Sequence, residues 1–149
     1  MSSQLYCFEY YSTQSNKIFS DDSYKVELKY PGQWVKVDGY KDRYGLDDGF
    51  FQVSAINGGT LDEVAEQEAF HPAKPYGSKP TILDKVIMGQ PAKMILPSPD
   101  QGSQMMNQVG LIVAYSKPII IDGNRYEYFV LWADKMHFDK IARSIKFIE

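Results

Sequence analysis

The sequence is poor in cysteine and histidine, the residues that most often bind transition metals or form cross-links. Its 149 residues include one cysteine, Cys7, and two histidines, His71 and His137. A single cysteine excludes a disulfide within the chain and a cysteine-rich zinc site. Because catalytic zinc needs about three converging nitrogen, sulfur or carboxylate ligands, we expect no metal site and no other cofactor.

Long apolar runs and an excess of positive charge are also missing. No uninterrupted apolar run approaches the roughly 20 residues that a membrane-spanning helix needs, so we predict no membrane insertion by this chain. The formal net charge is -3. Nucleic acid is therefore an unfavourable partner, because binding to phosphates depends largely on lysine and arginine.

What the sequence does have is enough apolar and aromatic residues for one folded domain. Hydrophobic residues make up 44% of the chain and aromatic residues 14%. Most aromatic residues lie in short alternating or β-branched segments, which are typical of strands. We predict a single sheet-rich domain over residues 1–149, a length that fits one domain, and the sequence is compatible with a monomer.

The order of the predicted elements is strands, helix, strands, helix. The strands are expected at residues 5–11, 24–30, 34–37, 50–56, 81–88, 92–96, 108–116, 119–121 and 125–132, separated by loops at 38–49, 70–80 and 97–107. Those loops are rich in glycine, proline, aspartate and other turn residues. This order indicates an antiparallel sheet with helices packed on it.

Both predicted helices have start signals. Thr60 and Glu63 form a capping box, in which each side chain binds the free backbone N–H of the other residue, and Pro72 ends that helix by His71. We expect Asp134 to cap the last helix. Four apolar residues at helical spacing should face the core there: Phe138, Ile141, Ala142 and Ile145.

Three segments resemble a known family. Residues 19–34, FSDDSYKVELKYPGQW, resemble the opening of PsbP/Mog-like domains, where a strand runs into a Tyr-Pro-x-x-Trp corner. Residues 88–94 and 141–147 are similar to a later hairpin and to the closing helix of that family. The resemblance implies an α+β fold, with an antiparallel β-sheet flanked by helices in an α/β/α sandwich. It implies no reaction, because the family includes photosystem assembly subunits, a Ran-binding transport factor and bacterial envelope proteins.

A second resemblance is narrower. Residues 49–56 and 67–71 resemble domains of Bacillus-type proteins, some of them attached to BlaR-like membrane metallopeptidases. The His-Glu-x-x-His zinc helix of that peptidase does not occur in this sequence, so its activity is not implied. These resemblances imply an extracytoplasmic location at the bacterial cell envelope. No basic-then-apolar start resembles a signal peptide, which leaves a cytoplasmic location open.

The first functional hypothesis is a non-catalytic module that binds a protein or an envelope ligand. Two polar loops supply its candidate binding residues: His71, Lys74, Tyr76, Lys79, Gln101, Met105 and Met106. Amide, cationic, aromatic and methionine side chains are common on adaptable binding surfaces. The spacing does not determine whether the two loops lie together. Trp34 and Trp132 are expected to be core anchors.

The alternative hypothesis is a small hydrolytic or metal-dependent enzyme. Its candidate residues are Asp47, Asp48, His71 and His137, which acid–base chemistry would require in one cleft. Against this stands a simpler interpretation, in which Asp47 and Asp48 form a solvated turn with Arg43 paired to one of them. In that interpretation His71 is a loop residue and His137 lies on a helix surface.

Overall fold

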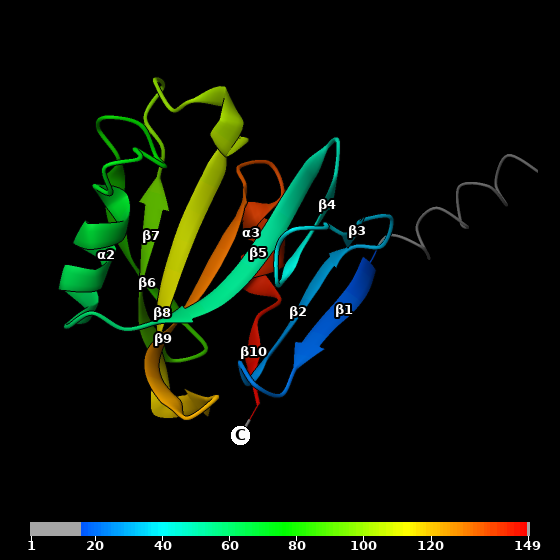
Figure 1. Cartoon of the computed structure of the whole chain (residues 1–149), viewed down its shortest axis with the longest axis vertical. Helices are drawn as coiled ribbons and strands as arrows, with labels where there is room; N and C mark the ends of the chain where they lie inside the picture. Colours follow the sequence, from blue (N-terminus) through cyan, green and yellow to red (C-terminus); the bar gives the residue numbers. More distant parts are fainter. Residues whose placement is uncertain (1–15, 149) are drawn as a thin grey trace, which may run out of the picture.

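The computed structural model describes residues 16–148 and shows a molecule built mainly of strands (Figure 1). Within this range there are ten β-strands in two sheets, two α-helices and one short 3₁₀-helix at Ser103–Met105. The strand predicted at residues 5–11 and Cys7 lie outside the described residues. In the described part of the chain, no helix is long and apolar enough to cross a membrane.

The larger sheet has seven strands, all paired antiparallel. Their spatial order is β3 (Val35–Lys36), β4 (Arg43–Leu46), β5 (Gly49–Ile56), β9 (Asn124–Asp134), β8 (Gln108–Ile121), β7 (Gln90–Leu96) and β6 (Thr81–Ile87). β8 and β9 form the hairpin expected from Asp122 and Gly123, whose positive φ angles of 50° and 81° suit a tight turn.

The central strands of this sheet are buried on both faces. Along β9, Phe129 and Leu131 belong to one core cluster, while Tyr128 and Val130 belong to the other. This alternation follows from the two-residue period of a strand. β8 divides its apolar residues in the same way, which confirms the prediction of a central strand covered on both sides.

A three-stranded sheet and one helix cover the first face. The small sheet has the order β1 (Asn16–Asp21), β2 (Val26–Pro31) and β10 (Lys146–Phe147), and α3 (Phe138–Arg143) lies beside it. The alternating side chains of β2 point into this core, which also holds Trp34 at 1% exposure. All four apolar residues predicted to face the core from the last helix are buried.

α2 (Leu61–Ala69) covers part of the second face with Val64, Ala65 and Ala69. Its capping box is present as predicted: the Glu63 amide donates to the Thr60 hydroxyl, and the Thr60 amide donates to the Glu63 carboxylate. The helix ends at Phe70, before Pro72.

The predicted α/β/α sandwich is wrong. Of the described residues, 50% are in strands and 14% are helical, and one of the layers on the large sheet is mainly a second sheet. β1 and β4 have no counterpart among the predicted elements, because turn residues crowd the first part of the chain. Asp134 is not the N-cap of α3 either: His137 holds that position without a side-chain capping bond.

Candidate functional site

The two polar loops predicted to form a binding surface do lie together. The Ser98 amide donates to the Tyr76 carbonyl at 2.9 Å, and the Lys79 amide donates to the Ser98 hydroxyl at 3.1 Å. The Ser78 amide donates to Asp100 at 3.1 Å. Gly77 permits this close approach, because a Cβ atom there would collide with Ser98 and Asp100. The loops are therefore one hydrogen-bonded unit.

Two of the predicted binding residues hold this unit together from inside. The Tyr76 ring is fully buried, and its hydroxyl donates to Glu68 at 2.7 Å. Glu68 also accepts from the Trp132 indole at 2.8 Å. Burial raises the pKa of Tyr76 well above its ordinary value. The Gln101 amide donates to the carbonyls of Pro75 and Gln108. Tyr76 and Gln101 are thus anchors within the fold.

The other predicted residues face outward to different degrees. His71, Lys74, Lys79 and Met106 are exposed, whereas Met105 is half-buried. The His71 ring accepts a hydrogen bond from the amide two residues later in its own loop. Met106 lies against the Arg43 guanidinium, with 3.2 Å between nitrogen and sulfur. The exposed remainder of the predicted patch is therefore small, and Lys74 and Lys79 carry its positive charge.

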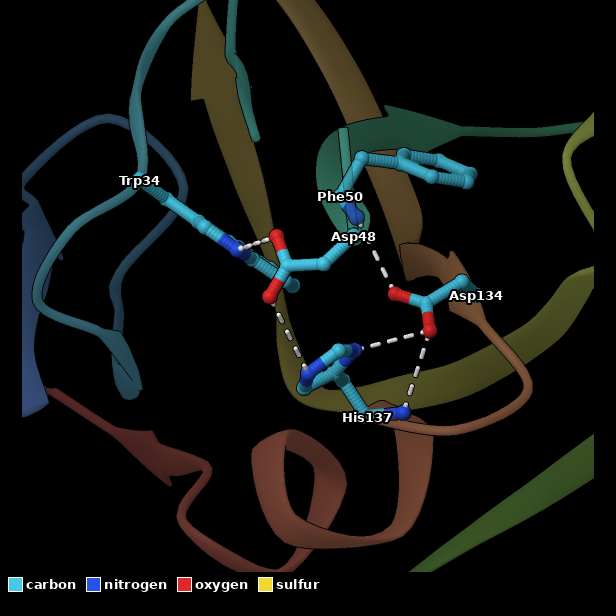
Figure 2. A network of polar contacts seen from close by, with 5 residues as sticks. All are labelled: Trp34, Asp48, Phe50, Asp134 and His137. Carbon is cyan, nitrogen blue, oxygen red and sulfur yellow. Dashed lines mark hydrogen bonds and ion pairs between the residues drawn. The ribbon is translucent and has the colours of Figure 1, made fainter. Parts of the chain in front are cut away.

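Asp134 and His137 form a partly buried polar contact (Figure 2). Asp134 is 6% exposed and accepts from the Phe50 amide at 3.0 Å. It also contacts the His137 ring at Nδ1, 2.8 Å away, and the His137 amide at 3.3 Å. Gly49 leaves the necessary room, because a Cβ atom there would collide with Asp134 and His137.

The other ring nitrogen of His137 faces a second carboxylate. Asp48 Oδ2 lies 4.0 Å from His137 Nε2, and Asp48 Oδ1 accepts from the Trp34 indole at 2.9 Å (Figure 2). The Trp34 and His137 rings pack edge to face, with centroids 4.8 Å apart. His137 is therefore not a helix-surface residue as predicted: its side chain is 23% exposed and joins three elements.

The four candidate catalytic residues do not assemble in one place. Asp48 and His137 come together, but His71 follows α2 on the other face of the large sheet, and Asp47 is exposed. In residues 16–148 no group of three or more histidine, cysteine, aspartate or glutamate side chains could hold a metal ion.

Arg43 does not pair with either acid of the predicted turn. Its guanidinium donates to Gln52 at 3.1 Å and lies over the Tyr40 and Phe50 rings, 4.5 and 4.1 Å from their centroids. This geometry is a cation–π arrangement. The interpretation of a turn neutralised by Arg43 is therefore wrong.

A groove at the far end of the large sheet was not predicted from the sequence. Its volume is about 650 Å³, and we call it the β8 groove. It is lined by Lys25, Met88, Gln90, Tyr115, Ser116, Lys117, Pro118, Ile119, Ile120, Phe147 and Ile148. These residues come from the β1–β2 turn, the β6–β7 turn, β8 and the C-terminal segment.

The groove forms where β8 no longer pairs with β7 and pairs irregularly with β9. The ladder between β7 and β8 ends at the pair Ala92–Val113. The ladder between β8 and β9 is irregular between Ala114 and Ile119, where four β8 residues stand opposite one β9 residue. The only sequence signal for it is the Lys117-Pro118 pair, which separates the strands predicted at 108–116 and 119–121, whereas the structure has one strand there.

The floor of the groove is ordered and aromatic. The Tyr115 ring packs edge to face with Phe147, 5.7 Å between centroids, and its hydroxyl donates to the Tyr24 carbonyl at 2.7 Å. Burial raises the pKa of Tyr115 above its ordinary value. The Ile148 amide donates to the Lys25 carbonyl at 2.8 Å, which holds the C-terminal segment against the β1–β2 turn.

The rim of the groove is apolar and exposed. Met88 and Ile120 are each 62% exposed, and Val86 of the adjoining strand β6 is 72% exposed. Lys25 and Lys117 are the charged residues of the lining, which contains no carboxylate among the described residues. The groove therefore combines an apolar surface with positive charge.

Comparison with known proteins gives no identification. No protein-family model matches the chain, and no curated protein is significantly similar to it. The resemblance to PsbP/Mog-like domains remains a prediction.

Proposed function

We propose that the chain is a non-catalytic binding module that holds a segment of a partner protein in the β8 groove. The observation that carries the proposal is the groove itself: a concave surface of about 650 Å³ with an aromatic floor, exposed apolar side chains at its rim and two lysines. Mostly apolar concavities with a few polar groups are the usual form of binding sites.

The state of the side chains supports the same proposal. Tyr115 and Phe147 are fixed by packing and hydrogen bonding before any ligand binds, so little conformational entropy is lost on binding. Met88 and Ile120 expose apolar surface that a partner would remove from water. Exposed apolar residues grouped beside a concavity mark interaction surfaces more often than isolated ones do.

The predicted loop surface is a weaker candidate. Its aromatic residue Tyr76 is buried, and the side-chain amide of Gln101 already donates to two backbone carbonyls. What remains exposed is His71, Lys74, Lys79 and Met106. A substitution of Tyr76 would disturb the fold and not the surface, so it cannot test partner binding at these loops.

The location of this module is proposed as the bacterial cell envelope. The sequence resemblance to envelope proteins supports this location. The partner would be a protein segment exposed in the envelope.

Site-specific photo-cross-linking in a bacterial envelope extract tests the proposal. A photoreactive amino acid replaces Ile120 in the full chain, and matched variants carry it at Val35 or Met136, which are 55% and 89% exposed but outside the groove. We expect a discrete adduct from position 120 alone, lost when Lys117→Glu is added. The same adduct from all three positions, or none from position 120, would refute the groove as a binding site.

Acid–base catalysis at His137 is the second candidate function. The observation that favours it is the contact between Asp134 and His137 Nδ1, because a buried carboxylate that orients an imidazole is a common feature of general-base sites. The Trp34 indole and Asp48 occupy the space in front of Nε2. Hydrolysis of model esters, amides or phosphate esters by the chain, abolished in His137→Gln, would support this candidate over the first.

A further inference from the structure

We infer that the ligand of the β8 groove is an extended peptide of alternating apolar and acidic residues, which adds as a strand to the edge of β8 beyond Val113. This inference rests on the proposed function of the groove and names the chemistry of its partner.

The first argument is an unpaired strand edge. β8 is 14 residues long, but β7 pairs only with Gly110–Val113. Beyond the irregularity, Ile119–Ile121 pair with β9 on one side, and no described strand pairs with them on the other side. An unpaired edge offers backbone N–H and C=O groups to an extended peptide, which is how sheet-extending ligands bind.

The second argument is the alternation of side chains at this edge. Ile119 is 6% exposed and packs in the core cluster, whereas Ile120 is 62% exposed on the opposite face. Tyr115 and Phe147 pack against the same cluster as Ile119. A strand paired here would alternate in the same way. One set of its side chains would meet the aromatic floor, which favours apolar residues at every second position.

The third argument is charge. Lys25 and Lys117 line the groove without a carboxylate beside them in the described lining, whereas Lys93 elsewhere on the sheet pairs with both Asp62 and Asp84. Ammonium groups of this kind select acidic partners and speed their association more than they add affinity. An anionic lipid would satisfy the lysines, but it has no backbone groups for the strand edge, so a peptide fits both features.

The free edge of β6 does not offer the same combination. It carries Asp84 and Lys85 at its centre, and charged residues on an edge strand discourage pairing with another chain. Lys85 on β6 is therefore a suitable control position for the lysines of the groove.

The test measures binding of synthetic peptides to the full chain by fluorescence anisotropy. The probe is a labelled peptide Glu-Val-Glu-Ile-Glu-Val, compared with Lys-Val-Lys-Ile-Lys-Val and with a version carrying proline in place of isoleucine. We expect the acidic peptide to bind at least tenfold more tightly than the other two. Lys25→Glu with Lys117→Glu should reverse the preference between acidic and basic peptides, and Lys85→Glu should leave it unchanged.

Several results would overturn the inference. They are equal binding of acidic and basic peptides, no loss with proline, no binding at all, or binding of phosphatidylglycerol vesicles without binding of the peptide. Self-association of the chain that Lys117→Glu abolishes would assign the groove to a second copy instead. If a partner is cross-linked at position 120 but the chain does not prefer the acidic peptide, the inference of an acidic strand is overturned. The proposed function of the groove as a partner-binding site then still holds.

Discussion

Asp134 Oδ2 lies 2.8 Å from His137 Nδ1, and this contact ties the end of β9 to the start of α3. The same carboxylate accepts from the Phe50 amide, so it also fixes the start of β5. His137, a catalytic candidate in the sequence, is thus part of the framework that positions α3 on the large sheet.

Asp134→Ala is expected to lower the free energy of unfolding by about 2–4 kcal/mol, because it leaves the buried Phe50 amide without an acceptor. Urea denaturation measures the change. Asp47→Ala is the matched control: that side chain is exposed, and its removal should cost less than about 1 kcal/mol. Equal effects of the two substitutions would contradict the structural role of Asp134.

Tyr76→Phe is expected to lower stability by about 1–3 kcal/mol, since the partly buried Glu68 carboxylate loses a hydrogen bond of 2.7 Å. Thermal unfolding followed by circular dichroism provides the measurement. Tyr40→Phe, at a ring that is 47% exposed, should be nearly neutral. If Tyr76→Phe were neutral as well, the hydrogen bond from Tyr76 to Glu68 would have no stabilising role.

Thr60→Ala is expected to destabilise the protein by about 1 kcal/mol through loss of the N-cap of α2. Thr60→Ser keeps a hydroxyl that can accept from the Glu63 amide, so it should retain most of the stability. Urea midpoints at a constant slope measure both. An alanine variant as stable as the serine variant would show that the capping box has no effect.

Asp100→Asn is expected to give a pH-dependent loss of stability. Hydrogen bonds from the side chains of Ser78 and Ser98, and then from the Ser78 amide, hold the pKa of Asp100 well below its usual range. A lowered folded-state pKa stabilises the folded protein above the ordinary aspartate pKa of about 3.9. That contribution is lost as the pH falls through the folded-state value. The stability gap between wild type and variant should therefore be constant near neutral pH and shrink below about pH 4.

Urea denaturation at several pH values between neutrality and strong acid measures this gap. Asp38→Asn, in an exposed loop, serves as the control and should show no comparable gap. A gap for Asp100→Asn that stays constant down to the acid limit would contradict the role of the Ser78 and Ser98 hydrogen bonds.

Local features of the fold could be predicted because their determinants are adjacent in the sequence. The capping box needs only Thr60 and Glu63, and the β8–β9 turn needs only Asp122 and Gly123. The alternation in β2 likewise predicts its buried face. Each of these depends on a few neighbouring residues and on no distant partner.

The arrangement of layers could not be predicted, because it depends on distant pairs. β10 is two residues long and becomes a strand only by pairing Lys146 with Glu27 and Phe147 with Val26. β4 lies within the segment 38–49, whose many turn residues predict a loop. Gly45 reads as a loop residue, yet a Cβ atom there would crowd Gly49 and Phe50 in the neighbouring strand.

The candidate site was missed for the same reason. The β8 groove joins residues from the β1–β2 turn, the β6–β7 turn, β8 and the C-terminal segment. None of its residues forms a motif within one segment. Among the loop residues that were predicted, the sequence could not show that Tyr76 lies inside, because aromatic residues in loops occur both as anchors and as contact residues.

Amide chemical-shift mapping tests the central claim most directly. The ¹⁵N-labelled full chain is titrated with the acidic peptide Glu-Val-Glu-Ile-Glu-Val, and the amides of residues 116–121 are compared with those of residues 74–79. If the β8 groove binds an extended acidic segment, the largest shifts fall on Ser116, Ile119 and Ile120, and Lys117→Glu abolishes them. Shifts confined to residues 74–79 and 98–106, or no shifts at all, would contradict the account.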